Sequence, residues 1–365
     1  EDTEGKRTDV RVCNLSYLQT DWYIDQMKRP AFSGEGQSSP LPISWKRYQY
    51  TAGKQEMTDV NPEVKIGDGL ISMKDLVKEV TAQDPALAKR LWGDNPFELK
   101  TAIQKFLLKN YGDLSESDKE LVASLPACLP SDTLYVTVDK EAVRRSGMMI
   151  PTDTLGNEVI PDQMVISLKG QDRVSKRFIM MLEMIAQSNF SRPLYMSTTV
   201  GSSNYGNLWR HFIQEGMAWR ISPFTFEENG MSYGIVHTVI DTDKAYENMM
   251  NKYRYGNLSQ PGLYIDETTM RMCFTHRRWF ANLITNLVKE GKKDMALKAL
   301  DKCEKEIPSY NVPHDINSAS LDIADAFIEC GKPERAVPIL EQIEKHSKEY
   351  IKWYLSLSNV YFASS

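Results

Sequence analysis

The residues best suited to chemistry in this sequence stand close together near the N-terminus, within Val10–Lys28. Asn14, Asp21, Trp22 and Tyr23 gather where an expected strand gives way to an expected helix. An aromatic face stacks on the C–H groups of a sugar, while a carboxylate accepts hydrogen bonds from its hydroxyl groups. These four residues are therefore a candidate sugar-binding site.

A purely structural role explains the same residues. Thr20 or Asp21 would cap the helix by accepting from its first free backbone amides, and Trp22 and Tyr23 would pack on a sheet. We favour this interpretation, because one helix start needs both roles filled. No second carboxylate can be placed opposite Asp21 from the sequence, so glycoside hydrolysis by a pair of carboxyl groups is not predicted.

A second candidate site is the loop Gly201–Gly206, which reads Gly-Ser-Ser-Asn-Tyr-Gly before a short helix expected from Leu208 to Gln214. Backbone amides in such a loop can cradle an anion, with Asn204 and Trp209 as candidate binding residues. The glycines lack the spacing of a dinucleotide fingerprint. An ordinary surface loop is the favoured interpretation.

Other motifs of known chemistry are absent from the sequence. It contains no nucleophile elbow, P-loop, HExxH or EF-hand loop. His211 and His237 stand without an evident partner, which is typical of structural histidines. The five cysteines form no CxxC pair, which argues against a zinc site. We therefore predict no catalytic residue, no metal and no cofactor for this chain.

The overall composition narrows the class of protein. The chain has 365 residues and a formal net charge of −5, which gives no reason to expect a nucleic-acid partner. No stretch approaches the roughly 18–20 apolar residues that span a bilayer. The length allows two or three domains, each with its own core. We expect a soluble, multidomain chain.

The first two thirds of the sequence alternate between strand and helix patterns. Val10–Tyr17 is β-branched and apolar enough for a largely buried strand, and a helix follows it directly. The same order returns later, with strands expected at Thr133–Val138, Met164–Leu168 and Arg192–Ser197 and a helix at Ser175–Asn189. This pattern predicts an α/β domain over residues 1–262, with a mixed, partly parallel sheet, flanking helices and a helical insertion at about 72–126.

The remaining residues, 263–365, are predicted to be all-α. Gly291, Ala296, Leu300 and Cys303 recur forty residues later as Gly331, Ala336, Leu340 and Ile343. A glycine that closes one helix, followed by small and apolar residues on the next, is typical of tetratricopeptide-like repeats. The period exceeds the usual thirty-four residues and Lys348 replaces a proline, so a generic pair of helical hairpins is the alternative. A third repeat would begin with a helix at Tyr350–Phe362.

Three motifs resemble a known family. They are Asp-Val-Arg-Val…Asn-Leu-Ser…Thr-Asp-Trp-Tyr-Ile near the N-terminus, Asn…Arg-Pro-Leu-Tyr at Asn189–Tyr195, and Gly-Met-Ala-Trp-Arg at Gly216–Arg220. They resemble the C-terminal soluble portion of multi-spanning membrane proteins of Bacteroidetes, a domain-of-unknown-function family whose membrane half is similar to protein O-mannosyltransferases. The resemblance covers most of Asp9–Tyr253 and adds Arg192 and Tyr195 to the candidate binding residues.

The resemblance implies a non-catalytic role for this chain. The catalytic carboxylate of such transferases lies in the membrane half, and Glu1–Thr8 lacks the Gly-Asp-Asn-Asp-type turn expected before Val10, so the chain resembles an excised fragment. It would face the periplasm at the inner membrane, attached through the missing N-terminal half. Its expected role is to bind or position an acceptor polypeptide or an envelope protein partner, with the repeats as the binding surface.

Two alternatives belong to other functional classes. The chain would be a free-standing sugar-handling enzyme if the Asn14–Trp22 junction and the Gly201–Gly206 loop formed one site. It would be a pure interaction scaffold if only the helical repeats carried its function. For the leading interpretation, the resemblance implies that the parent protein is a glycosyltransferase similar to O-mannosyltransferases and that this fragment alone is not an enzyme.

Overall fold

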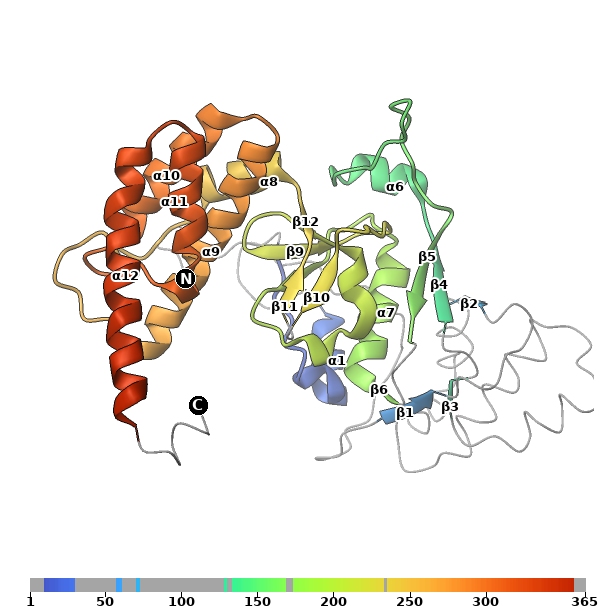
Figure 1. Cartoon of the computed structure of the whole chain (residues 1–365). Coiled ribbons are helices and arrows are strands. Elements are labelled where there is room, and N and C mark those ends of the chain that lie inside the picture. The colour runs from blue at the N-terminus through green and yellow to red at the C-terminus, as the bar shows by residue number, and fades with distance from the viewer. Residues whose placement is uncertain are drawn as a thin grey trace, which may run out of the picture. The chain divides into compact units, whose positions relative to one another are not determined.

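The computed structural model describes residues 10–29, 57–60, 70–72, 128–129, 133–168, 173–232 and 235–357. The chain divides into two compact units (Figure 1). The first comprises Glu1–Tyr195, Thr199–Phe212 and Ile221–Thr238, and the second comprises Met196–Thr198, Ile213–Arg220 and Val239–Ser365. The helical insertion expected at about 72–126 lies outside the described residues, apart from Ser72.

The first unit contains several short sheets. In one, β1 (Met57–Val60) pairs in parallel with β3 (Cys128–Leu129) and antiparallel with β6 (Arg173–Ser175). In another, β4 (Thr133–Thr137) pairs in parallel with β2 (Leu70–Ser72) and antiparallel with β5 (Gln163–Ser167). A two-stranded sheet pairs β10 (Gly230–Ser232) with β11 (Ile235–His237). Mixed, partly parallel pairing is confirmed, but it is distributed over small sheets.

The predicted elements of this unit form where side-chain periodicity is clear. Leu134 and Val136 point inward from β4 while their neighbours are more exposed, as the two-residue period of a strand requires. Helix α7 (Lys176–Ser188) buries Phe178, Met181, Leu182 and Ile185, and ends at Asn189 in the left-handed conformation. The short helix α6 (Lys140–Arg145) is capped by Asp139, whose carboxylate accepts a hydrogen bond from the Ala142 amide at 3.0 Å.

The strand predicted at Val10–Tyr17 is wrong. This segment is irregular and leads into the 3₁₀ turn η1 (Tyr17–Gln19) and then helix α1 (Asp21–Met27), whose N-cap is Thr20. Val12 is 83% exposed. The Asn14 side-chain oxygen accepts from the amides of Ser16 and Tyr17, and such local bonds compete with sheet pairing.

A second correction concerns residues 192–214. The strand expected at Arg192–Ser197 is confined to β7 (Tyr195–Ser197). The helix expected from Leu208 is replaced by the 3₁₀ helices η2 (Ser202–Asn204) and η3 (Gly206–His211), followed by strand β8 (Phe212–Gln214). All three residues of β8 are buried. A short buried segment of this kind is consistent with either a helix or an interior strand, and pairing with neighbouring strands decides between them.

The second unit begins with a four-stranded sheet of order β12-β8-β9-β7, in which β9 spans Ala218–Ile221 and β12 spans Val239–Ile240. Strand β12 lies parallel to β8. Helix α8 (Thr242–Glu247) follows, capped by Asp241, and a π-helical turn, η4 (Asn248–Lys252), extends it. The second unit thus takes in both this sheet and the helical region.

Four longer helices follow: α9 (Glu267–Lys289), α10 (Lys293–Glu306), α11 (Ser320–Glu329) and α12 (Pro333–Ser356). The turns after α9 and α11 have the same geometry. Gly291 and Gly331 have φ of 75° and 76°, and each following amide, of Lys292 and Lys332, donates to the carbonyl five positions back at 2.8 Å. The forty-residue repeat is therefore a structural repeat of two helical hairpins, and the tetratricopeptide assignment stays a prediction.

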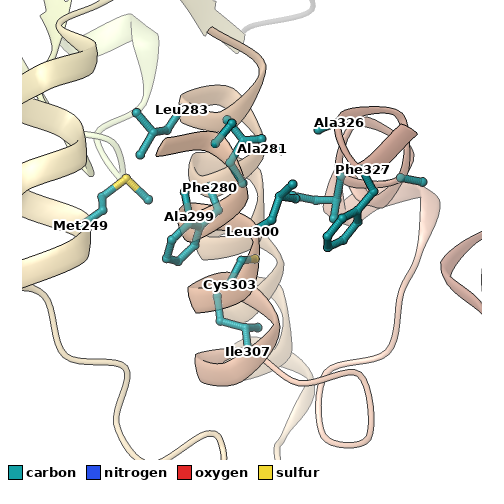
Figure 2. Close-up of a cluster of buried hydrophobic side chains, with 14 of the residues drawn as sticks. Met249, Phe280, Ala281, Leu283, Ala299, Leu300, Cys303, Ile307, Ala326 and Phe327 are labelled. Atoms are coloured by element: carbon teal, nitrogen blue, oxygen red, sulfur yellow. The ribbon is translucent and has the colours of Figure 1, made fainter. Parts of the chain in front are cut away.

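The core of this unit lies around α9. Figure 2 shows Phe280, Ala281 and Leu283 of α9 among side chains of α10 and α11, with Met249 pointing toward them from η4. The small residues Ala299 and Ala326 let the helix backbones approach, and both are buried. Each fully buried large side chain contributes roughly 1.5–3 kcal/mol relative to an exposed one.

A separate third helix from Tyr350 is not formed. Helix α12 instead continues without interruption through Tyr350 to Ser356. No glycine or proline lies between Ser347 and Ser356 to end the helix, so helix propagation is uninterrupted there.

Candidate functional site

Three aromatic residues of the first unit, Tyr17, Trp22 and Tyr23, form a cluster that we call the aromatic platform. Their ring centroids lie 5.5–5.8 Å apart, in tilted and edge-to-face arrangements. Tyr23 is only 7% exposed, whereas Tyr17 and Trp22 are 49% and 47% exposed. The platform therefore consists of two half-exposed rings in contact with a buried third ring.

The platform is held by local hydrogen bonds and by two buried aliphatic anchors. The Tyr23 hydroxyl accepts from the backbone amide of Asn14 at 2.8 Å, and the Thr20 hydroxyl donates to the Tyr17 carbonyl at 2.7 Å. Leu18 and Ile24 are fully buried and anchor η1 and α1. Burial raises the pKa of Tyr23, so this phenol stays neutral. These contacts within the segment hold the rings in position.

Two arginines lie close to the platform. Arg11 donates to the carbonyl oxygens of Gln26 at 3.1 Å and of Arg29 at 2.5 Å. Burial lowers the pKa of Arg11, and the positive charge of Arg192 lowers it further, which places Arg192 within electrostatic reach. Positive charge therefore gathers beside the platform.

Cys13 in the same segment is not a nucleophile. Burial raises the pKa of its thiol to about 11, against the smaller opposite effects of Tyr23 and Arg11. A thiol with so high a pKa carries almost no thiolate near neutral pH, and the thiolate is the reactive form.

The structure brings together some of the predicted site residues. Asn14, Trp22 and Tyr23 belong to one cluster, and Arg192 is near it. Asp21 is the first residue of α1, and its side chain lies outside the described part of the structure. Tyr195 opens β7 with 49% of its surface exposed.

The remaining predicted residues make contacts within their own turns. Asn204 donates its side-chain amide to the Gly201 carbonyl at 3.1 Å, which closes the loop on itself. The Arg210 guanidinium stacks over the Trp209 ring, 4.7 Å from its centroid. The Trp209 carbonyl accepts from Asn229 at 3.2 Å. These contacts position the loop without defining an anion site.

Sequence reasoning missed a buried ionic cluster in the second unit. Glu215 lies at the end of β8, and its carboxylate accepts from Arg220 at 3.2 Å and from Lys244 at 3.3 Å. Asn248 donates to the Glu215 carbonyl at 2.8 Å, and the Tyr253 hydroxyl accepts from the Met217 amide at 3.1 Å. Glu215 precedes Gly216, and Arg220 follows it by four residues, in a largely apolar stretch of the sequence. Charged residues in such a stretch were the sequence signal that could have indicated a buried ion pair.

This ionic cluster has a structural role. Glu215 and Arg220 are 2% and 1% exposed, so a substrate has no access to them. The contacts connect the turn between β8 and β9 to α8 and η4. A buried charge is tolerated only when it is paired and hydrogen-bonded. Arg220 and Lys244 pair with the Glu215 carboxylate in this way.

Two searches of the described residues bear on function. They contain no group of three or more His, Cys, Asp or Glu side chains arranged to hold a metal ion. None of the described helices is long and apolar enough to cross a membrane.

Comparison with known proteins identifies one family. Residues 1–244, of 365 in the chain, match the model of the family described as TMEM260-associated domain 2. No curated protein and no solved structure matches the chain. The matched region contains the aromatic platform and the Glu215–Arg220 pair, and it ends within α8.

Proposed function

The chain belongs to the TMEM260-associated domain 2 family, and we propose that it acts as the accessory domain of a membrane-embedded, O-mannosyltransferase-like glycosyltransferase. It binds or positions the acceptor polypeptide and does not catalyse transfer alone. The family match over residues 1–244 carries this proposal. The domain acts on the periplasmic face of the inner membrane, beside the membrane active site.

The aromatic platform supports a binding role. Its two half-exposed rings, Tyr17 and Trp22, offer apolar faces that are already fixed in place. Preorganised rings lose little conformational entropy when a polypeptide or a sugar stacks on them. Arg11 and Arg192 add positive charge near the platform, which would attract acidic groups of an acceptor.

The helical region at 263–365 supports a protein partner. Hairpins of this type stack into elongated surfaces that bind peptides or envelope proteins. Leu321, Ile328, Val337 and Leu340 are 39–51% exposed on α11 and α12. A pure scaffold that binds an envelope protein is the second candidate function, and these residues favour it.

A free-standing sugar-handling enzyme is less well supported. The Asn14 side-chain oxygen accepts hydrogen bonds from the backbone amides of Ser16 and Tyr17. The Asn204 side-chain amide donates to the Gly201 carbonyl within the same loop. Neither group is directed at a common ligand position. The polar groups that such an enzyme needs for orienting a sugar are occupied locally.

The proposal is tested in the intact membrane protein. Deletion of Asp266–Ser365, or the milder double substitution Tyr17→Ala with Trp22→Ala, is expected to reduce acceptor glycosylation while lipid-linked sugar binding stays unchanged. Tyr264→Ala removes an aromatic ring that is 92% exposed elsewhere and serves as the control. Unchanged glycosylation in both altered proteins would refute the accessory role.

Affinity capture distinguishes the two candidate functions. The soluble chain, immobilised and exposed to purified acceptor polypeptide, is expected to retain it through the platform. A scaffold would retain an envelope protein and would ignore the acceptor. Loss of capture in the Trp22→Ala chain, but not in the Tyr264→Ala chain, assigns the binding to the platform.

A further inference from the structure

Helix α12 extends beyond the helix on which it packs. Ala336, Ile339 and Ile343 are 1–7% exposed and pack in the helical core. Helix α11 has 10 residues and α12 has 24, so their lengths are about 15 and 36 Å at the usual rise per residue. Figure 1 shows the last turns of α12 continuing past the end of α11. We call Tyr350–Ser356 the overhang.

Large apolar side chains cover more than half of the circumference of the overhang. At about 100° per residue, five of them follow one another over an arc of about 200°, in the order Trp353, Tyr350, Tyr354, Ile351 and Leu355. All five are between 38% and 74% exposed. A packed helix usually buries a stripe about 100° wide, so a single partner helix would leave much of this arc in water. Only surroundings that enclose the helix on several sides can cover the arc.

The side chains on this arc are of the kinds that gather at the interface of a lipid bilayer. Tryptophan and tyrosine have an apolar ring and a polar N–H or O–H group, and both are enriched at the level of the headgroups. Trp353, Tyr350 and Tyr354 occupy one side of the arc, whereas Ile351 and Leu355 occupy the other. The arc therefore combines rings suited to the headgroup layer with aliphatic side chains suited to the acyl boundary.

The opposite side of the helix carries lysines. Lys345, Lys348 and Lys352 are spaced by three and four residues, so they lie on one stripe, and all three are exposed. They outnumber the two carboxylates of these turns, Glu349 and Glu344, of which Glu344 pairs with Lys348. An apolar face with tryptophan and leucine opposite a lysine stripe is typical of helices that lie in a membrane interface. Lysines at such positions extend their ammonium groups toward anionic headgroups.

We propose that the overhang inserts into the interfacial layer of a phospholipid bilayer that contains anionic lipids. The aromatic rings lie among the headgroups, the aliphatic side chains reach the acyl boundary, and the lysine stripe faces the lipid phosphates. The overhang itself carries no carboxylate that anionic lipids would repel. Its seven residues span about 10 Å, against about 30 Å for the hydrocarbon core, so it enters the interface without crossing the bilayer.

This membrane contact goes beyond the proposed accessory function and does not depend on it. The overhang lies outside residues 1–244, whose family match carries that function. The Tyr17→Ala and Trp22→Ala changes of the platform leave the overhang intact. The accessory function and the membrane contact can therefore fail separately.

Cosedimentation of the full 365-residue chain with phospholipid vesicles tests the insertion. On vesicles of phosphatidylcholine mixed with phosphatidylglycerol, we expect half-maximal binding at about 0.1–1 mM accessible lipid, close to the strength of a single acyl anchor. Trp353→Glu should weaken this binding about tenfold or more, because a carboxylate replaces the interfacial ring. Tyr264→Glu changes an exposed aromatic residue outside the helix and should leave binding unchanged.

A second variant tests the lysine stripe. Lys352→Gln should weaken binding about fivefold on the mixed vesicles, because each cation near an anionic surface strengthens binding by about that factor. On vesicles of phosphatidylcholine alone, the same substitution should have little effect. An equal loss on both kinds of vesicle would contradict the placement of the stripe at the headgroups.

Tryptophan fluorescence locates the contact. Phosphatidylcholine brominated in its acyl chains should quench part of the emission of the seven tryptophans. Trp353→Phe keeps an aromatic ring and should still bind, but this quenching should disappear. Far-UV circular dichroism of the Trp353→Glu chain should match that of the unaltered chain, which excludes unfolding as the cause of lost binding.

Three results would overturn the proposal. The first is a chain that does not bind the mixed vesicles at about 5 mM lipid. The second is binding that Trp353→Glu leaves unchanged, or quenching that persists in Trp353→Phe. The third is a dimer in solution that Trp353→Glu dissociates, because the overhang would then be covered by a second copy of the chain.

Discussion

The Glu215 carboxylate lies 3.2 Å from the Arg220 guanidinium, and both side chains are almost completely buried. The two residues flank the turn at Gly216 between β8 and β9, and Lys244 adds a second cation from α8. A buried pair of this kind is stable only while both charges are present. The pair therefore makes the fold sensitive to single substitutions.

Arg220→Met is expected to lower the free energy of unfolding by about 3–5 kcal/mol, because it leaves the Glu215 carboxylate buried with a single, more distant cation. Urea denaturation followed by circular dichroism measures the loss. The control is Arg271→Met, whose exposed partner Glu267 is one helical turn away, and its effect should be under about 1 kcal/mol. A loss of similar size in both variants would show that Lys244 alone neutralises Glu215.

Gly216→Ala is expected to destabilise the chain by about 3 kcal/mol. Gly216 has φ of 110°, and an added Cβ would lie 2.5 Å from the Tyr253 hydroxyl oxygen. Gly256→Ala is the matched control, because Gly256 has φ of 64° and open space around it. Its cost should be only the backbone term of about 1 kcal/mol. Equal costs in thermal denaturation would mean that the Tyr253 ring moves away freely.

Stability should fall as the pH drops from about 7 toward 4, through two buried histidines. Burial lowers the pKa of His314 to about 3, aided by the charge of Arg277, and lowers that of His211 to about 4. The unfolded chain binds protons at these positions below pH 6.5 or so, whereas the folded chain does not. The native state therefore holds fewer protons, and its stability rises with pH.

The pH effect can be assigned to one residue. Each such histidine should cost about 2 kcal/mol at pH 5 relative to pH 7.5. His314→Gln should reduce the difference between the two pH values by that amount, as measured by urea denaturation at each pH. An unchanged difference would mean that His314 titrates alike in the folded and unfolded chain.

Arg277→Met should be among the most damaging substitutions in the helical region. The Arg277 guanidinium donates to the carbonyls of Ile307, Val312 and Pro313 at 2.5–3.1 Å and to the Ser318 hydroxyl at 3.3 Å. Its loss leaves several buried acceptors unsatisfied, at a cost of about 3 kcal/mol or more. Arg278→Met, at an exposed neighbouring position, should change the denaturation midpoint little.

Arg277→Lys gives a sharper form of this test. A lysine keeps the charge but has a single nitrogen, which cannot reach acceptors spread around a planar fork. We expect it to recover less than half of the loss in denaturation experiments. Full recovery would show that charge, and not the fork geometry, holds the loop between α10 and α11.

Tyr23→Phe should destabilise the N-terminal segment by about 1 kcal/mol, because the Asn14 amide loses its acceptor. Trp22→Phe, on the exposed part of the platform, should change stability by less than about 0.5 kcal/mol. Hydrogen exchange of the Asn14 amide reports the difference directly. Equal protection in the two variants would contradict the assigned hydrogen bond.

Local patterns predicted the elements whose side chains repeat regularly. The burial of Leu134 and Val136 in β4, the inner face of α7 and the glycine turns at Gly291 and Gly331 all follow from neighbours in sequence. Val10 and Val12 show where this reasoning fails. Their alternation favours a strand, but the Asn14 side chain binds nearby amides and turns the chain instead.

The candidate site was predicted only in part. The clustering of Trp22 and Tyr23 with Asn14 could be expected, because these residues are near in sequence. Arg192 belongs to a segment far away in sequence, and its charge acts on Arg11 only because the fold brings the two segments within electrostatic reach. The burial of Glu215 with Arg220 and Lys244 likewise requires three segments to meet.

By itself, the sequence determined the helical hairpins, the mixed strand-and-helix order and the family, because each depends on residue types at short, regular spacings. Only the tertiary structure decided that the N-terminal segment is irregular and that Glu215 is buried. It also decided that α12 is longer than α11 and that Trp353 is exposed. The physical reason is that the burial of a side chain and its charged or hydrogen-bonding partners depend on residues far away in sequence. The periodicity of neighbouring residues gives no information about those distant residues.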